Sequence, residues 1–136
     1  TFQPIHEEEV EQHKIHSEAY DISAVAAEQI ARARNAKRPV LAVGTTVVRA
    51  LEDAAQKSES EGFVVRAGKA EAEIFIRPGH PFRIVDHLLT NFHLPKSSLL
   101  VLVAAFAGRE RILRAYQHAI AQGYRFYSYG DCMLIR

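Results

Sequence analysis

Residues 39–49, Pro-Val-Leu-Ala-Val-Gly-Thr-Thr-Val-Val-Arg, decide the fold class. The apolar run 40–43 predicts a strand that Gly44 ends, and the two threonines after it predict the start of a helix over 45–56. A strand, a turn and a helix in this order are typical of parallel sheets. The sequence therefore predicts an α/β fold in which helices flank a layered, mostly parallel sheet.

The segments on either side predict further helices and strands. Apolar residues at helical spacing follow Asp21 and Ser23, either of which can cap a helix that runs to residue 36. Ser97 or Ser98 can cap a later helix in the same way. The remaining predictions are a polar loop over 57–69, strands over 72–77 and 82–85 around the turn 78–81, an irregular segment over 89–95, helices over 99–106 and 109–121, and a final strand over 132–135.

The size and composition are those of one globular domain or of one piece of a larger enzyme. The chain has 136 residues, 48% of them hydrophobic and 24% charged, which excludes a disordered or collagen-like chain. The longest apolar run, 99–107, is about half the roughly 20 residues that a membrane-spanning helix needs, so we expect no membrane segment. Cys132 is the only cysteine, which favours a reducing, cytoplasmic setting. We expect Cys132 to be a small core residue without nucleophilic chemistry.

Charge is distributed unevenly along the chain. Seventeen Lys and Arg against sixteen Asp and Glu give a net charge of +1, so the whole molecule has no positive field that would hold a polyanion. Residues 1–21 carry six acids and one base, whereas residues 96–136 carry six bases and two acids. Any contact with nucleic acid must therefore use a local patch; the alternative is that both segments are solvated faces.

The turn after the predicted central strand is the first candidate site. Gly44 lets a ligand approach the backbone, and the hydroxyls of Thr45 and Thr46 and the helix amides can hold a carboxylate or phosphate. Arg49 lies one turn further along the predicted helix. One glycine is too few for a dinucleotide-binding fingerprint. The alternative is a capped helix whose arginine is solvated.

Histidines supply the second candidate. His13 and His16 share a face if their segment is helical. A metal would need a third ligand, for which Glu18 or His93 is available, but the spacing matches no zinc signature, and we expect no metal. A general base is the better functional interpretation because imidazole titrates near neutral pH. Surface or hydrogen-bonded histidines are the alternative.

Two later segments carry groups suited to a heterocycle. Asn91 and His93 offer donors and acceptors, and Phe92 between them can supply a stacking face. The alternative is a turn that satisfies its own backbone. In residues 124–131 aromatic side chains and an arginine precede Gly130 and Asp131, which suits a splayed nucleotide but also an ordinary edge strand.

Taken in order along the chain, these motifs resemble those of the S-adenosylmethionine:tRNA ribosyltransferase-isomerases of queuosine biosynthesis. The motifs that carry the resemblance are His13-Lys14-Ile15-His16-Ser17-Glu18, Val43-Gly44-Thr45-Thr46, Ile74-Phe75-Ile76 with Pro78-Gly79, Leu88 to Ser97, Ala105-Phe106-Ala107-Gly108-Arg109-Glu110, and Tyr124-Arg125-Phe126 with Gly130-Asp131. Two departures are a cysteine at position 132, where the family often has a small residue, and a longer, more charged segment over 57–73.

The resemblance implies a fold, a reaction and partners. Residues 1–136 would be the C-terminal part of the larger α/β domain, with the N-terminal portion of the enzyme and its β-barrel subdomain absent. The family moves and isomerises the ribosyl group of S-adenosylmethionine onto 7-aminomethyl-7-deazaguanine in tRNA, giving epoxyqueuosine-tRNA, adenine and methionine. It implies a cytoplasmic monomer that needs no metal. We expect the chain alone to be inactive because its site lacks the other portion.

The resemblance also suggests a role for each candidate residue. His93, or one of His13 and His16, would transfer the proton, and Thr45, Thr46 and Arg49 would anchor the methionine carboxylate of S-adenosylmethionine. Asn91 and Asp131 would contact a base or ribose, and Tyr127 and Arg125 would touch RNA. Two other classes of function stay open: a nucleotide- or anion-binding module without chemistry, and a structural interaction domain.

Overall fold

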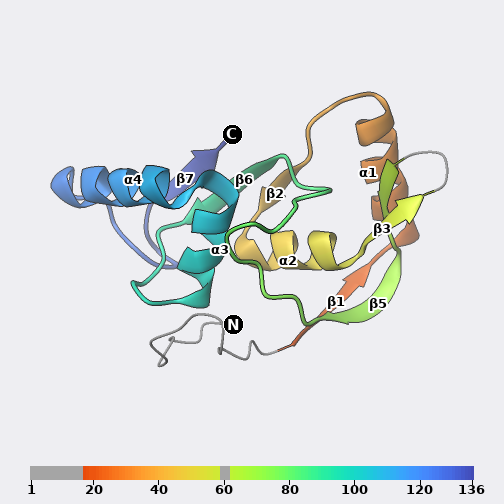
Figure 1. The fold of residues 1–136 in the computed structure, drawn as a ribbon, viewed down its shortest axis with the longest axis horizontal. Coiled ribbons are helices and arrows are strands. Elements are labelled where there is room, and N and C mark those ends of the chain that lie inside the picture. Colours follow the sequence, from red (N-terminus) through yellow and green to blue (C-terminus); the bar gives the residue numbers. More distant parts are fainter. Residues whose placement is uncertain (1–16, 59–61) are drawn as a thin grey trace.

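The computed structural model describes residues 17–58 and 62–136. His13 and His16 lie outside the described residues. In chain order the elements are β1 (Glu18–Ile22), α1 (Ala24–Asn35), β2 (Leu41–Val43), α2 (Thr45–Asp53), β3 (Ala55–Ser58), β4 (Gly62–Val65), β5 (Gly68–Ala72), β6 (His87–Asn91), α3 (Ser98–Ala107), α4 (Arg109–Ala121) and β7 (Cys132–Ile135). Figure 1 shows α3 and α4 on one side of the molecule and α1, β1, β3 and β5 on the other, with α2 between them.

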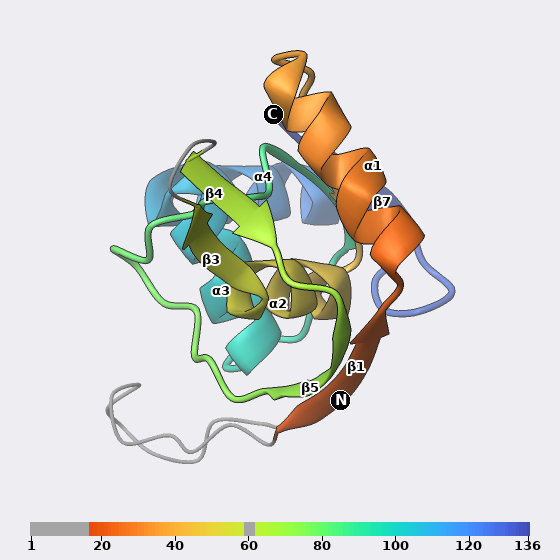
Figure 2. The same ribbon diagram turned by 90° about the vertical axis from the view of Figure 1, so that its right-hand side faces the viewer.

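A three-stranded sheet, in the order β2-β6-β7, lies at the centre. β2 runs parallel to β6, and β7 runs antiparallel to β6. The other described strands form two antiparallel pairs, β1 with β5 and β3 with β4 (Figure 2). The expectation of a mostly parallel sheet is therefore wrong for the described residues, although the α/β class is correct. Two successive helices, α3 and α4, separate β6 from β7 along the chain.

The register of the sheet separates a buried face from an outer face. Ala42, Leu88 and Ile135 are aligned across the three strands, and they are 0%, 0% and 8% exposed in the core with α2 and α3. Val43 and Leu134, which both pair with Leu89, point to the opposite face and are 60% and 52% exposed. The described residues thus leave an apolar strip on the outer face of the sheet uncovered.

The caps predicted for the helices after Ser23 and Ser97 are confirmed. Ser23 caps α1, its Oγ accepting the N–H of Ala26 at 3.1 Å, and Ser97 caps α3 by accepting the N–H of Leu100 at 3.2 Å. Gly108, with φ of 89°, separates α3 from α4. The final strand over 132–135 is also confirmed as β7.

The segment after α2 differs from its prediction. α2 ends at Asp53 instead of residue 56, because 55–58 pairs with 62–65 as the β3–β4 hairpin. The predicted loop over 57–69 is therefore wrong. Cross-strand pairing stabilises the extended backbone of this polar segment. The hydrophobic pattern of the segment itself does not predict the hairpin.

The strands expected over 72–77 and 82–85 are also absent: β5 ends at Ala72, and no strand runs between it and β6. Over 83–85 the reason is Glu52, whose buried carboxylate accepts the N–H groups of Arg83, Ile84 and Val85 at 2.8, 3.0 and 2.9 Å. The amides that would donate to a neighbouring strand thus donate to one side chain instead. β6 in turn occupies 87–91, part of the segment expected to be irregular.

Candidate active site

Several of the predicted polar groups lie at one edge of the central sheet. β2 and β6 are parallel, so their carboxyl ends, Val43 and Asn91, lie at the same edge, where β7 begins opposite Asn91. The N–H of Gly44 donates to the carbonyl of Leu89 at 2.8 Å and ties the turn before α2 to β6. In α/β sheets ligands bind outside the carboxyl ends of parallel strands. This edge is therefore the candidate active site.

The start of α2 forms one wall of this edge. Gly44 is the N-cap residue with φ of 93°, a left-handed conformation that disfavours other residues, and it provides no side-chain cap. The expected cap by the threonines is thus wrong: they stand in the first turn, with Thr45 buried and Thr46 exposed. The first amides of α2 therefore face the edge without a capping side chain, which suits a carboxylate or phosphate.

His93 lies in a hollow that Asn91, at the end of β6, also lines. The hollow has a volume of about 390 Å³, and its lining includes Asn91, His93 and Tyr127. The Nε2 of His93 is 3.0 Å from the Oγ1 of Thr90. Burial lowers the pKa of His93 below its ordinary value of 6.5, which keeps the imidazole neutral at pH 7. A neutral imidazole has one free lone pair, the requirement for a general base.

The backbone of His93 is held separately. Its N–H donates to the Oη of Tyr116 on α4 at 2.7 Å. Burial raises the pKa of Tyr116, so the hydroxyl stays protonated through the neutral range. Thr90 and Tyr116 therefore fix the ring and the backbone of His93 from two different elements.

Tyr127 is held in an unusual backbone conformation. Its φ is 71°, in the left-handed region that side chains rarely adopt. Its N–H donates to the carbonyl of Phe92 at 3.0 Å, and its carbonyl accepts the Nδ2 of Asn91 at 3.2 Å. The ring of Tyr127 is 53% exposed. The chain thus fixes the backbone at this position and leaves an aromatic face open to the hollow.

Asp131 and Arg125 close the loop that carries Tyr127. Asp131 Oδ2 accepts the N–H of Arg125 at 2.8 Å, and its Oδ1 lies 3.4 Å from Arg125 Nη2. The hydrogen bond from the Arg125 N–H lowers the pKa of Asp131. Gly130 is required between them, because a Cβ there would lie 2.3 Å from the Arg125 carbonyl oxygen. The segment is this tight loop, so the edge-strand alternative for 124–131 is wrong.

Arg49 is not at the edge with the other candidates. It is 5% exposed, its Nη1 lies 3.0 Å from the Oε2 of Glu18, and its Nη2 donates to the Ala72 carbonyl at 2.9 Å. The alternative of a solvated arginine is therefore excluded. Arg49 joins α2 to the β1–β5 pair.

Phe92 is not available as a stacking face. It is 4% exposed, and its ring lies against Tyr116, Tyr124 and Phe126, with centroids 5.3, 5.8 and 5.1 Å away. It builds an aromatic cluster behind His93. Cys132, expected in the core, is exposed instead, because it begins β7 at the edge of the sheet.

The sequence did not identify three residues that shape the site: Thr90, Tyr116 and Glu52. Thr90 stands three positions before His93, so the sequence could have predicted that its hydroxyl contacts the candidate base. Tyr116 and Glu52 act on residues 23 and 31 or more positions away, and no local pattern predicts that contact.

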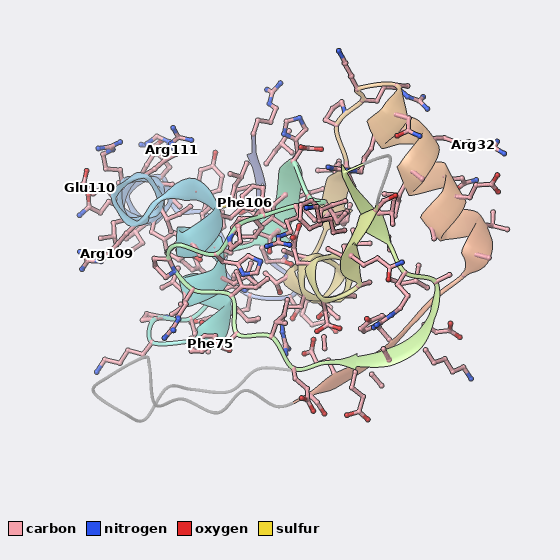
Figure 3. All side chains as sticks on the ribbon, turned by 45° about the vertical axis from the view of Figure 1, so that its right-hand side comes forward. Arg32, Phe75, Phe106, Arg109, Glu110 and Arg111 are labelled. Atoms are coloured by element: carbon pink, nitrogen blue, oxygen red, sulfur yellow. The ribbon has the colours of Figure 1, made fainter. Side chains whose placement is uncertain are left out.

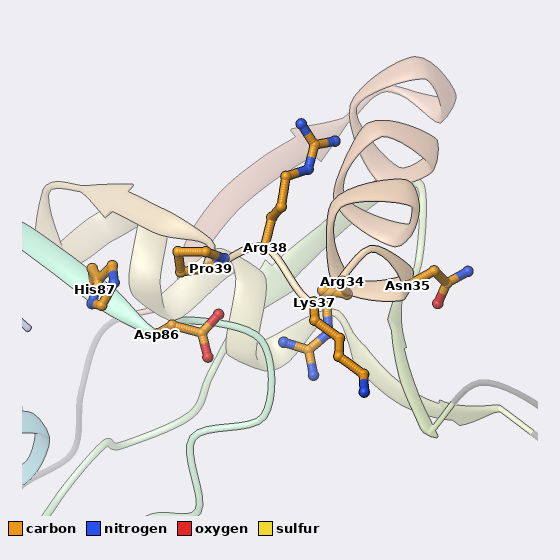
Figure 4. A pocket seen from close by; sticks show the side chains of 7 residues that line it. All are labelled: Arg34, Asn35, Lys37, Arg38, Pro39, Asp86 and His87. Atoms are coloured by element: carbon orange, nitrogen blue, oxygen red, sulfur yellow. The ribbon is translucent and has the colours of Figure 1, made fainter.

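A second hollow, of about 460 Å³, lies at the opposite edge of the sheet (Figure 4). Its lining includes Arg34, Lys37, Arg38, Asp86 and His87. Figure 4 shows the Asp86 carboxylate on the side of the hollow that faces the Arg34 guanidinium. This hollow therefore contains its own counter-charge.

Among residues 17–58 and 62–136, no three His, Cys, Asp or Glu side chains gather as a metal site. Within the same residues, every helix is too short or too polar to cross a membrane.

The fold and the edge site define an α/β protein that can hold a small polar ligand where two parallel strands end. Comparison with known proteins is more specific. The chain belongs to the queuosine biosynthesis protein family, whose model matches residues 1–135.

Curated relatives in this family are named S-adenosylmethionine:tRNA ribosyltransferase-isomerase. Those of Paraburkholderia phytofirmans and Burkholderia cenocepacia are each 54% identical over 135 residues, which is 99% of this chain. The chain spans 38% of the length of these relatives. The crystal structure of S-adenosylmethionine tRNA ribosyltransferase from Thermotoga maritima matches with a TM-score of 0.74 at 42% identity, over 87% of this chain and 40% of that one. The resemblance noted from the motifs is thereby confirmed.

Proposed function

We propose that the protein transfers and isomerises the ribosyl group of S-adenosylmethionine onto 7-aminomethyl-7-deazaguanine in tRNA, giving epoxyqueuosine-tRNA with release of adenine and methionine. The observation that carries the proposal is the 54% identity, over 99% of this chain, to relatives named for this activity. A neutral, oriented histidine in a hollow at the carboxyl edge of the sheet supports it. The remainder of the enzyme would complete the site, in a cytoplasmic monomer.

His93 is the proposed proton-transfer residue. The sulfonium of S-adenosylmethionine acidifies the carbon beside it, and a base near neutrality can then remove a proton there. His93 fits this task because burial keeps it unprotonated and Thr90 orients its ring. His13 and His16 remain candidates for the second proton transfer, to the departing adenine.

The start of α2 is the proposed anchor for the methionine carboxylate. The exposed Thr46 hydroxyl and the first amides of the helix supply the donors, with Thr45 packed beneath them. Arg49 is assigned to this anchor as a positioning residue. Its contacts with Glu18 and Ala72 hold the helix in place, and it would not touch the carboxylate directly.

The loop at the other side of the hollow is proposed to receive the RNA base. Asn91 and Asp131 place the loop through hydrogen bonds to the backbone, and their remaining acceptor positions face a base or ribose. The open ring of Tyr127 suits stacking, and the exposed guanidinium of Arg125 suits a phosphate. No step of this proposal requires a metal.

The full-length protein, incubated with substrate tRNA and S-adenosylmethionine, tests the proposal. We expect adenine and methionine to be released in equal amounts as the tRNA is modified. A nucleotide- or anion-binding module would bind without releasing adenine. A structural interaction domain would show no increase of melting temperature with S-adenosylmethionine, whereas a native-state ligand must raise it.

A further inference from the structure

A cleft between α3, α4 and the segment before Gly79 carries three cations that the proposed chemistry does not use. Its volume is about 610 Å³, and Arg77, Lys96 and Arg109 line it. Leu100, Ile112 and Leu113 form part of an apolar floor. No carboxylate is among the described residues that line the cleft. The cleft therefore suits an anion with an apolar body.

Two of the three cations stand where local structure disfavours them. Lys96 has φ of 55°, a left-handed conformation, directly before the N-cap residue of α3. Arg109 is the first residue of α4, at the positive end of the helix dipole, where a cation is repelled. Residues with an unfavourable backbone conformation or an unfavourable charge for their position are found mainly at functional sites. A bound anion would relieve the repulsion at Arg109 and use the charge at Lys96.

The hollow at the end of α1 shows why a count of cations is not sufficient. Arg34, Lys37 and Arg38 also gather there, but Asp86 lies among them. Those cations stand at the carboxyl end of a helix, where the dipole favours them without a ligand. Neither explanation applies to Lys96 and Arg109.

The cleft adjoins the candidate active site. Leu99 lines the hollow of His93, whereas the next residue, Leu100, lines the cleft. Lys96 follows His93 by three residues, and the turn between them is closed by Ser97 Oγ, which donates to the Leu94 carbonyl at 2.8 Å. A chain-like ligand can therefore cross from one to the other over this turn.

From this charge complementarity and continuity, we propose that the cleft binds the RNA strand of the substrate next to the nucleotide being modified. Lys96 and Arg109 take a phosphodiester group, and the apolar floor takes the adjoining ribose and base. The inference rests on the proposed function for the identity of the RNA.

Matched variants of the full-length protein test the cleft. Lys96→Gly and Arg109→Gln should each weaken binding of the tRNA transcript roughly tenfold, as loss of one charge-assisted contact does. Each should also lower the slope of log Kd against log salt by about one. The melting temperature of Lys96→Gly should equal or exceed that of wild type, because glycine accepts a left-handed φ. A structural role would instead lower it.

Two control variants make the same two substitutions, Lys to Gly and Arg to Gln, at residues that do not line the cleft. Lys37 has φ of 54°, so Lys37→Gly relieves the same strain at the end of α1. Arg111→Gln removes a cation from the same turn of α4, and Figure 3 shows Arg109 and Arg111 leaving the helix on different sides. Both controls should bind tRNA as wild type does.

The outcomes separate this inference from the proposed function. If wild type releases adenine but the cleft variants bind tRNA with unchanged affinity and salt slope, the cleft assignment fails alone. If the controls weaken binding as much as the cleft variants, the effect is one of net charge and the assignment also fails. If wild type releases no adenine, the proposed function fails, whereas selective loss of tRNA binding would still support the cleft.

Discussion

The buried carboxylate of Glu52 accepts the backbone N–H of Ile84 at 3.0 Å, which fixes a segment without regular structure to the last turn of α2. The same carboxylate also accepts the neighbouring amides of Arg83 and Val85. One side chain thus accepts the backbone hydrogen bonds of 83–85 that a neighbouring strand would otherwise accept. It thereby fixes the segment that precedes β6 and the candidate site.

Replacing Glu52 by Gln should destabilise the protein by about 3 kcal/mol, because an amide NH₂ would face backbone donors and leave them unsatisfied. The free energy of unfolding in urea measures this. Glu110→Gln, on the exposed start of α4, is the control and should change stability by less than about 0.5 kcal/mol. Equal effects in the two variants would contradict the assigned role of Glu52.

His93 predicts a pH dependence of activity. Because burial lowers the pKa of His93 below its ordinary value, the neutral base forms at a lower pH than for a free imidazole, and kcat should rise with pH on the acid side and then level off. His93→Gln should lose activity by at least about a hundredfold and show no such limb. His118→Gln, on α4, should retain the wild-type profile.

The same lowered pKa predicts how stability depends on pH. A histidine held neutral binds fewer protons folded than unfolded, so its contribution is complete above pH 6.5 and is lost as the pH falls below it. Half-buried His80, whose pKa burial also lowers, acts in the same direction. Melting curves between about pH 5 and pH 8, roughly one and a half units either side of the ordinary pKa, should therefore show a smaller loss of stability at low pH in His93→Gln than in wild type.

Tyr116→Phe should reduce kcat more than it raises KM. The variant keeps the ring but removes the hydroxyl that accepts the His93 N–H, and an unsatisfied buried donor costs about 1–3 kcal/mol. Tyr124→Phe, in the same aromatic cluster, is the control because only its ring contacts Phe92. Steady-state kinetics with saturating S-adenosylmethionine separate the two parameters.

Gly130→Ala should disrupt the loop between Arg125 and Asp131, because its Cβ would lie 2.3 Å from a backbone oxygen that cannot yield. We expect loss of tRNA modification and a cost of about 3 kcal/mol or more, as for other severe backbone strain. Gly123→Ala, at φ of 70° in open space, should cost only about 1–2 kcal/mol. Similar melting temperatures for the two variants would show that the loop relaxes.

Arg49 decides between direct anchoring and positioning. Arg49→Met leaves the Glu18 carboxylate buried without its cation and should cost about 3–5 kcal/mol, while Arg49→Met with Glu18→Gln should recover part of the loss. If Arg49 only positions α2, the double variant keeps its affinity for S-adenosylmethionine. A large loss of affinity at restored stability would instead identify a direct contact with the carboxylate.

Local signals explain what could be predicted from the sequence. The caps Ser23 and Ser97 and the stop at Gly108 are properties of a few adjacent residues, and the helices they bound are found where expected. The β3–β4 hairpin and the absent strands over 72–85 depend on partners elsewhere in the chain, so local periodicity was misleading there.

Local residue types also predicted part of the candidate site. Asn91, His93 and Tyr127 belong to two segments whose residue types suit a heterocycle, and these three residues line one hollow. Their catalytic and binding roles stay predictions. Arg49 and Phe92 were chosen for their chemistry, but burial assigns them to other contacts, and burial depends on the whole fold.

The uncovered strip of Val43, Leu89 and Leu134 has a practical consequence for work with these 136 residues alone. Exposed aliphatic side chains on a sheet favour association between copies of the chain. Such a preparation should therefore scatter more light as its concentration rises, and it should bind hydrophobic dyes. Leu134→Lys should reduce both signals, because it places a charge in the middle of the strip.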